Sequence, residues 1–442
     1  MYIRPVRYLP PVVIEAPTPN RVQRTYLVLI LLQTLAASLI WGINTLFQLD
    51  AGLTLTEAFV ANAAYTAGMV IFEVPTGVVA DAAGRRVSFI IGAATLLVTT
   101  AAYLGLWYVE APVLWWVIVS VFLGLGFTFF SGATEAWLVD ALDATGFDGA
   151  MENVFGRGRT VAGVATLIGT VAGGFLAQVN LGLPYIVRSV LLAGLIVVAF
   201  VSMHDIGYTP HRGASIRAEV SRILQASIRH GFGNPPVRMF MLAAPFSLGI
   251  TVWMFYAFQP YLLQLLGDPD AVYLAGIAAA FYAVAQMIGG ASVKWVRRRF
   301  ATRTGIILTQ IVVSFLALVG VGAAELLPIP VGFWVASGLL AVVLLGESLT
   351  SPLQQAYVNE VIPSQQRATV LSFASLMGSA GGVVTQPALG KVADVFSLGF
   401  AYVISGFVFL IQFPFIWAVR RMGLKADTVV IHRDAVTGED LA

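Results

Sequence analysis

The chain has 442 residues, of which 58% are hydrophobic and 11% are charged, and its formal net charge is +2. Soluble domains carry roughly a quarter charged residues, so this composition excludes a soluble globule and indicates a protein of the lipid bilayer. The absence of cysteine excludes disulfides and thiolate metal sites.

Apolar segments of about 20 residues recur along the chain, and each is long enough to cross a hydrocarbon core of about 30 Å. Because lipid offers the backbone no hydrogen-bond partner, these segments should be helices, so we expect an all-α membrane protein of about twelve spans. The expected spans cover residues 25–48, 56–80, 87–109, 113–141, 158–180, 183–203, 237–266, 271–294, 303–325, 329–360, 367–393 and 398–420. The N-terminal segment lacks the apolar core and small-residue cleavage site of a secretory signal, so the first span should direct insertion.

Nearly all basic residues border one side of the expected spans. With the N-terminus inside, all but two of the 25 Lys and Arg residues fall on the cytoplasmic side, the exceptions being Arg188 and Lys391. Both termini are therefore expected in the cytoplasm, and the short loops suit a bacterial inner membrane. Topology explains the basic residues, so no nucleic-acid partner is expected. Arg188 lies one turn inside an outer end, where it is expected to snorkel or to meet an anionic substrate.

The longest polar stretch divides the chain into two groups of six spans. The expected organisation is a cytoplasmic N-terminal segment at 1–24, a six-helix bundle at 25–203, a cytoplasmic linker at 204–237, a second bundle at 238–421 and a cytoplasmic tail at 422–442. Within the linker, Ile216, Val220, Leu224 and Ile228 recur at helical spacing. This pattern predicts an amphipathic helix on the inner membrane surface, with a solvated tether as the alternative.

The two halves repeat each other. The segment from Ser131 to Asp140 aligns with that from Ser351 to Glu360, and the segment from Glu73 to Arg86 aligns with that from Gln286 to Arg299. In both alignments a first-half glutamate, Glu135 or Glu73, meets a glutamine. Parallel repeats of this kind predict two pseudo-symmetric bundles with a substrate site between them near the bilayer midplane.

The stretch Gly77-Val-Val-Ala-Asp81-Ala-Ala-Gly84-Arg85-Arg86 resembles the loop signature of the major facilitator superfamily, Gly-x-x-x-Asp-x-x-Gly-Arg-Arg/Lys between spans two and three. With about twelve spans and a degenerate copy at Gly290 to Arg299, the resemblance covers nearly the whole chain. It implies a transporter, not an enzyme. In the family, the signature's acid and bases lock the halves in the outward-open state. The resemblance therefore implies an inner gate. In the first half it would consist of Gly77, Asp81, Arg85 and Asp140, and in the second half of Arg298 or Arg299 with Glu360. Arg85 and Arg86 serving only as topological anchors is the alternative.

A shorter stretch, Gly169-Thr170-Val-Ala-Gly173-Gly174, resembles the Gly-Pro-x-x-Gly-Gly motif of the family's drug–proton antiporters, with Thr170 in place of the proline. It implies efflux, although small residues also let helices approach closely in lipid. The span-four arginine that those antiporters use in proton coupling is absent from Val121 to Phe130.

Three glutamates lie inside expected spans, where a charge costs about 2.5–3.5 kcal/mol on insertion scales. They are Glu73, Glu135 and Glu347. They lie at different depths, as a proton relay or a cation path requires, and burial favours their protonated form, so each could load and release a proton. A neutral carboxyl that is hydrogen-bonded within one half is the alternative for all three. Glu73 also shares a stripe with Gly77 and Asp81, so a place at the interface between the halves is a further alternative for it.

Polar residues share faces of two expected spans. Thr128, Ser131, Gly132 and Glu135 share one face, and Ser348, Ser351, Gln355 and Asn359 share the matching face of the tenth span. The first and seventh spans add Trp41, Asn44 and Gln48, and Trp253, Tyr256 and Gln259. We expect these residues to line the substrate cavity, where aromatic and amide groups suit a lipophilic cation of drug size or a sugar.

The leading interpretation is a secondary active transporter that exchanges inward-moving protons for a small lipophilic or cationic substrate. Proton-coupled uptake of a polar metabolite such as a sugar is the alternative, and a membrane receptor or scaffold that has lost transport is a third. The phosphate-binding motif Gly-x-x-x-x-Gly-Lys-Ser/Thr is absent and the four His residues form no metal set, so we expect no ATP drive, cofactor or metal. The expected partners are a small-molecule substrate, protons and the lipid bilayer, and we expect a monomer.

Overall fold

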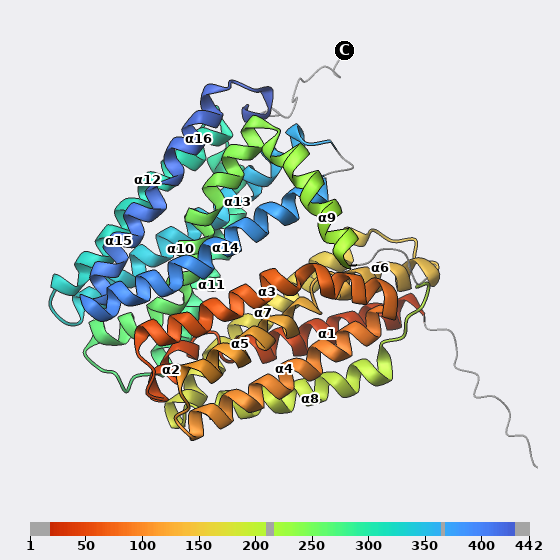
Figure 1. The fold of residues 1–442 in the computed structure, drawn as a ribbon, viewed down its shortest axis with the longest axis horizontal. Helices are drawn as coiled ribbons and strands as arrows, with labels where there is room; N and C mark the ends of the chain where they lie inside the picture. Colours follow the sequence, from red (N-terminus) through yellow and green to blue (C-terminus); the bar gives the residue numbers. More distant parts are fainter. Residues whose placement is uncertain (1–17, 209–215, 364–366, 429–442) are drawn as a thin grey trace, which may run out of the picture.

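The computed structural model describes residues 18–208, 216–363 and 367–428. In these residues the chain forms helices in two groups (Figure 1), α1 to α8 in one and α10 to α16 in the other, with α9 between them. The helices are α1 Pro19–Ser38, α2 Asn44–Asp50, α3 Leu55–Ala83, α4 Arg85–Tyr108, α5 Val113–Thr128, α6 Ala133–Ala144, α7 Met151–Val179, α8 Leu183–Ser202, α9 Ile216–Ser227, α10 Pro235–Leu266, α11 Tyr273–Val296, α12 Arg303–Ala323, α13 Val331–Val361, α14 Arg367–Val395, α15 Leu398–Leu410 and α16 Gln412–Arg421.

Ten helical segments of the described residues are long and apolar enough to cross a membrane. The first span, α1 with α2, and the eleventh, α14, complete the two six-helix bundles. Both are less apolar than the other ten, since α1 carries Arg21 and Arg24 in its first two turns and α14 carries several serines and glycines. The expected all-α architecture of two six-helix bundles is confirmed.

Three spans that read as continuous in the sequence are broken. The first turns between α1 and α2 at residues 39–43, the fourth between α5 and α6 at residues 129–132, and the twelfth at Ile411. At the second break Gly132 has a φ of +71°, a left-handed conformation that glycine adopts without a steric penalty. At the first break, a Cβ on Gly42 would lie 3.0 Å from the Cα of Gly276 in the other half.

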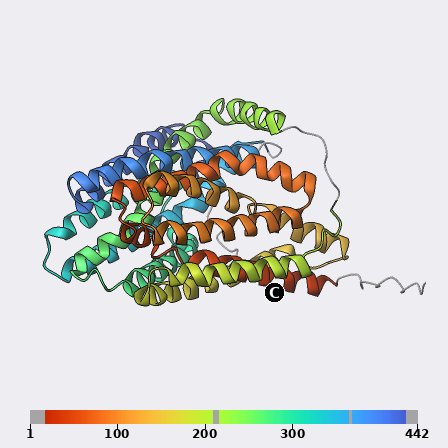
Figure 2. The same ribbon diagram turned by 60° about the horizontal axis from the view of Figure 1, so that its bottom comes forward.

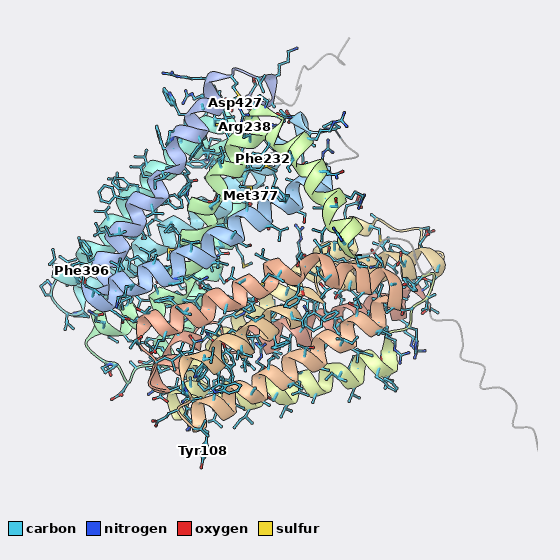
Figure 3. The ribbon with its side chains drawn as sticks, viewed as in Figure 1. Tyr108, Phe232, Arg238, Met377, Phe396 and Asp427 are labelled. Atoms are coloured by element: carbon cyan, nitrogen blue, oxygen red, sulfur yellow. The ribbon has the colours of Figure 1, made fainter. Side chains whose placement is uncertain are left out.

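The two bundles meet at one end of the molecule and separate toward the other (Figures 1 and 2). We name the end that holds α9 and the helix termini at Ala83 and Val361 the linker end, and the opposite one the closed end. Between the bundles α3 packs on α14 and α7 packs on α11, while α9 contacts both α3 and α14. Tyr108 and Phe396 point outward near the closed end (Figure 3), where aromatic side chains suit a membrane interface.

The linker is only partly described. The side chains of Ile216 and Leu224 lie outside the described part of the chain, as do residues 1–17 of the N-terminal segment and 429–442 of the tail. Val220 and Ile228 are exposed. The amphipathic face of α9 therefore stays a prediction.

The side chain of Gln259 on α10 joins the two halves at the break in the first span. Its Oε1 accepts a hydrogen bond of 2.8 Å from the Thr45 backbone N–H, and its Nε2 donates one of 2.9 Å to the Trp41 carbonyl. The Thr45 hydroxyl also donates to the Tyr256 carbonyl. A helix break leaves backbone groups without an intrahelical partner, and here the opposite half supplies one. Gln259 is fully buried, so this contact, the Gln259 latch, holds the closed end shut.

A second contact between the halves caps the start of α3. The carboxylate of Asp394, near the end of α14, accepts hydrogen bonds of 3.2 and 2.8 Å from the backbone N–H groups of Leu55 and Thr56. The Thr56 hydroxyl donates to the same carboxylate. The N-terminus of a helix carries a partial positive charge and unpaired N–H groups. Asp394 therefore stabilises α3 only while the closed end is shut.

The glycines of the antiporter-like stretch pack against two neighbours. A Cβ on Gly173 would lie 1.9 Å from the Leu39 carbonyl oxygen in the same half, and a Cβ on Gly174 would lie 2.9 Å from the Cα of Gly276 in the other half. A Cβ on Gly276 would lie 2.4 Å from the carbonyl oxygen of Thr170. For this stretch the sequence left open an efflux motif or close helix packing. Close packing is present on both of its faces.

Removing the Gln259 latch should open the closed end. In Gln259→Leu the Thr45 N–H and the Trp41 carbonyl lose their partner, and each buried unpaired group costs roughly 1–3 kcal/mol. The chain has no cysteine, so spin labels on Val179→Cys and Leu326→Cys, both highly exposed at the closed end, can report the distance between the halves. We expect a longer distance population in Gln259→Leu. The matched control is Gln264→Leu, an exposed glutamine of the same helix, and an unchanged distance distribution in both variants would contradict the latch.

Candidate functional site

A cavity of about 660 Å³ opens between the halves on the linker side, and we name it the first vestibule. Its walls come from α1, α3, α5, α6 and α14. Glu73, Glu135, Ser131, Gly132 and Thr128 all line it. The polar face that the sequence placed on the fourth span therefore borders this cavity.

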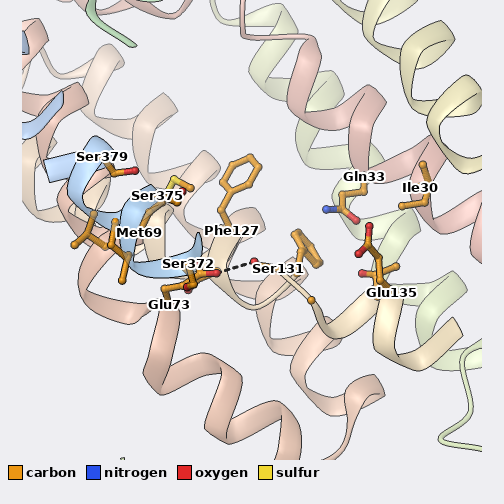
Figure 4. A pocket seen from close by; sticks show the side chains of 16 residues that line it. Ile30, Gln33, Met69, Glu73, Phe127, Ser131, Glu135, Ser372, Ser375 and Ser379 are labelled. Carbon is orange, nitrogen blue, oxygen red and sulfur yellow. Dashed lines mark hydrogen bonds between the residues drawn. The ribbon is translucent and has the colours of Figure 1, made fainter. Parts of the chain in front are cut away.

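Glu73 of α3 is half-buried in the wall of the first vestibule. The hydroxyl of Ser131 donates a hydrogen bond of 2.8 Å to its Oε1 (Figure 4). Ser131 belongs to the break between α5 and α6, so the break brings a donor to a carboxylate of the second span. The contact lies within one half.

Glu135 lies in the first turn of α6 and is exposed to the first vestibule. A carboxylate in a first turn is stabilised by the partial positive charge of the helix N-terminus. Gln33 of α1 lines the same cavity on the same side (Figure 4), and its Oε1 has no hydrogen-bond partner in the described residues. Glu135 is thus open to water and to small molecules from the linker side.

A second cavity of about 410 Å³, the second vestibule, lies within the other half. Glu347 of α13 lines it and accepts a hydrogen bond of 2.8 Å from Nε2 of Gln310 on α12. Ser351 and Gln355 also line this cavity. The same Gln310 Nε2 donates to Ser314 at 3.0 Å, so Glu347 belongs to a polar cluster that faces the second vestibule.

One helix separates the two vestibules. Ser375 of α14 lines both, and Ser372 and Ser379 line the first (Figure 4). A row of serines on this face explains why α14 is less apolar than its neighbours. The first vestibule therefore has walls from both halves, and α14 contributes polar groups to it.

A small pocket of about 40 Å³ lies between the first vestibule and the closed end, and we name it the central pocket. Arg188 of α8 lines it and is 1% exposed. Its Nε donates to the Thr100 hydroxyl at 3.0 Å and its Nη1 donates to the Ala36 carbonyl at 3.3 Å. The structure thus buries this arginine among helices, and it does not snorkel.

The substrate residues expected from the first and seventh spans separate into three groups. Trp41 and Tyr256 line the central pocket, as does Asn44. Gln48 and Asn44 both donate to Oδ1 of Asn62, at 3.2 and 3.0 Å, in a buried network. Gln259 forms the latch, and Trp253 is fully buried against Phe59 and Tyr402.

Two residues of the tenth span lie away from the second vestibule's lining. The Ser348 hydroxyl donates to the Gln286 carbonyl of α11 at 2.6 Å, and the Asn359 carbonyl accepts from Arg367 at 2.7 Å. The contact of Ser348 with Gln286 parallels that of Ser131 with Glu73, because both join the fourth span of a half to its second.

The expected gate residues pair within each half in this state. Arg85 Nη1 lies 2.7 Å from Asp81 Oδ1, and its Nε lies 4.0 Å from Asp140 Oδ2. Glu360 accepts from Arg303 of α12 at 2.6 Å, so its partner here is neither Arg298 nor Arg299. Gly77 has open space around the position that a Cβ would take. These contacts leave the linker side open.

The vestibule geometry can be checked by labelling. Ser375→Cys places a thiol on the wall shared by the two vestibules, and the parent chain has no cysteine to give background. We expect rapid modification by a membrane-impermeant maleimide in solubilised protein. Ser405→Cys is the matched control, because Ser405 is fully buried and should react slowly. Equal rates at the two positions would mean that no open vestibule reaches Ser375.

Comparisons with known proteins agree with this fold. The family model of the Major Facilitator Superfamily matches residues 26–385. An uncharacterized MFS-type transporter, YxaM of Bacillus subtilis (strain 168), is 21% identical over 345 residues, which cover 77% of this chain and 82% of the relative. Among solved structures, a point mutant of the nucleoside transporter NupG matches with a TM-score of 0.73 at 14% identity, covering 90% of this chain and 99% of that one. A D-xylose-proton symporter matches with a TM-score of 0.65 at 14% identity, covering 90% and 96%.

Proposed function

The chain belongs to the major facilitator superfamily, and from that membership and the site geometry we propose that it is a proton-coupled exporter of small lipophilic compounds that works by alternating access. The observation that carries the proposal is the first vestibule, which has walls from both halves and holds two membrane-embedded carboxylates. By its family the chain is a membrane transporter.

We propose that the linker end faces the cytoplasm. Nearly all Lys and Arg residues border this side of the spans, and basic residues flanking spans stay cytoplasmic. The described state would then be inward-facing, with both termini inside and the Gln259 latch sealing the outer side. A bacterial inner membrane and a monomeric state are part of the same proposal.

The proposed proton carriers differ in their surroundings. Glu135 and Glu73 are reached from the cytoplasmic vestibule, whereas Glu347 is hydrogen-bonded to Gln310 in the other half. A carboxylate that loads a proton in one state and releases it in the other must change its exposure between the states. Glu135 is the best placed for this, because it is exposed here and would be covered if α1, α6 and α14 closed over the vestibule.

A lipophilic substrate is supported by an aromatic pocket of about 190 Å³. Its apolar walls include Trp41, Phe255, Phe258 and Tyr282 from both halves. We name it the aromatic pocket. Ligand sites are mostly apolar with a few polar groups, and this pocket has that composition. The carboxylates of the vestibules would also attract a cation. The proposed substrates therefore include lipophilic cations.

Efflux is favoured by the glycine stretch at Gly169 to Gly174, which resembles that of drug–proton antiporters. Uptake of a polar metabolite such as a sugar is the second candidate. It is supported by the serine and glutamine side chains of the vestibules, among them Ser375 and Gln355, and by the structural likeness to a D-xylose-proton symporter. A receptor or scaffold without transport is less well supported, because the first vestibule lies between the two halves, as a transport pathway requires.

The experiment that tests the proposal uses proteoliposomes with little buffer. Lipophilic compounds of different charge and a set of sugars are added in turn, and the proton flux is followed by a pH dye. We expect a substrate-dependent proton movement opposite in direction to the substrate, with Glu135→Gln reducing the flux by at least about tenfold because the coupling carboxyl is lost.

The matched control is Glu152→Gln, an exposed carboxylate near the linker end of α7 outside the first vestibule, which should leave the flux unchanged. Protons that move in the same direction as the substrate would replace export by uptake. An unchanged flux in Glu135→Gln would assign Glu135 a structural role, and no flux with any compound would remove the proton-coupled proposal.

A further inference from the structure

We propose that the central pocket binds a carboxylate, and that the transported compound is an amphiphilic monoanion whose head contacts Arg188 and whose apolar body occupies the aromatic pocket. This inference rests on the proposed transport function and names its substrate class. It also replaces the cationic substrate that the sequence suggested.

The first observation is an incompletely paired buried cation. Arg188 Nε and Nη1 are satisfied by Thr100 and Ala36, but Nη2 has no hydrogen-bond partner in the described residues. No carboxylate of the described residues lies within ion-pair distance of this guanidinium. The guanidinium carbon also lies 6.0 Å from the centroid of the Phe127 ring. Burying a charge without a counter-ion is costly, so an anion from outside the chain would stabilise this arginine further.

The second observation is an unpaired donor on a neighbouring wall. Asn62 of α3 is 2% exposed and lines the central pocket. Its Oδ1 accepts from both Asn44 and Gln48, which directs its Nδ2 elsewhere, and Nδ2 has no partner in the described residues. Arg188 and Asn62, each with one unpaired donor, thus line a single cavity. A carboxylate has two acceptor oxygens and can bind both.

Three tyrosines also belong to the walls of the central pocket. Tyr65, Tyr103 and Tyr256 also line the central pocket, and tyrosine hydroxyls donate to carboxylates. The Tyr103 hydroxyl is already engaged with Ser120. A cation in this position would face the guanidinium of Arg188 directly and would be repelled in a medium of low dielectric constant.

The size of the pocket places the rest of the substrate. A cavity of about 40 Å³ accommodates a carboxylate group and little more. Trp41 and Phe255 line both this pocket and the aromatic pocket of about 190 Å³. The two cavities therefore share a wall, and an apolar body attached to the carboxylate would reach the second one once the side chains of Trp41 and Phe255 move apart.

The test is direct binding to the purified full-length chain in lipid nanodiscs by isothermal titration. The probes are three compounds of the same shape, namely 4-phenylbutanoate, 4-phenylbutanamide and 4-phenylbutylamine. We expect the carboxylate to bind about tenfold to a hundredfold more tightly than the amide, since a hydrogen bond to a charged group is stronger than a neutral one. The amine should bind weakest. Equal affinity for the carboxylate and the amide in the parent chain would overturn the proposal without any variant.

Substitutions locate the site. Arg188→Gln should remove the preference for the carboxylate but retain amide binding, which shows that the variant is folded. Phe255→Ala should weaken the carboxylate and the amide equally. Arg421→Gln, an exposed arginine at the end of α16, is the matched control and should change neither affinity.

A carboxylate preference that survives in Arg188→Gln would place the anion elsewhere. If Arg188→Gln does not fold, Asn62→Leu replaces it, and an undiminished preference in that variant would overturn the proposal.

The assay needs no proton gradient and no transport. Loss of proton coupling in proteoliposomes would therefore leave the binding result intact. Absence of carboxylate binding would leave the transport proposal standing with another substrate class.

Discussion

A backbone inside a lipid bilayer must pair its peptide groups by hydrogen bonds. At the break in the first span, this requirement couples one half of the molecule to the other. The turn at residues 39–43 frees the Thr45 N–H and the Trp41 carbonyl, and Gln259 of the opposite half pairs with both. A break that was stabilised within its own half would leave the two halves independent. Because the partner comes from the other half, the local conformation of the first span depends on closure of the closed end. The two cannot change separately.

The ends of the antiparallel helices α3 and α14 also depend on how the two halves meet. Asp394, near the C-terminal end of α14, caps the N-terminus of α3 at the closed end. Asp81, near the C-terminal end of α3, lies at the linker end and pairs there with Arg85 of its own half. The carboxylates occupy opposite ends of the pair. If the halves rock, contact at one end separates the other, so a carboxylate at each end can stabilise one state at a time.

The sequence was sufficient for the all-α fold and its two six-helix bundles, because these rest on composition, periodicity and internal repetition. The breaks in the first, fourth and twelfth spans could not be predicted from the sequence. Gly132 aligns with Pro352, yet α6 begins anew after Gly132 while α13 runs through its proline. Glycine permits a positive φ without requiring it, and the packing of neighbouring helices decides which glycine uses this freedom. The Gln259 latch was likewise not predictable, because the sequence does not show which glutamine reaches an unpaired peptide group.

The surroundings of Arg188 depend both on a helix break and on an unpaired peptide group, neither of which the sequence shows. Its position near a span end suggested snorkelling, but the broken first span offers a different partner. In the last turn of α1 the Ile40 N–H donates to Ala37 and not to Ala36, and Arg188 Nη1 takes the Ala36 carbonyl instead. The C-terminal end of a helix carries a partial negative charge that favours a cation. Glu135 uses the opposite end in the same half, since it lies in the first turn of α6 after the second break. Each break in the first bundle thus creates a helix terminus within the span, and each terminus lies beside one charged side chain of opposite sign to its partial charge.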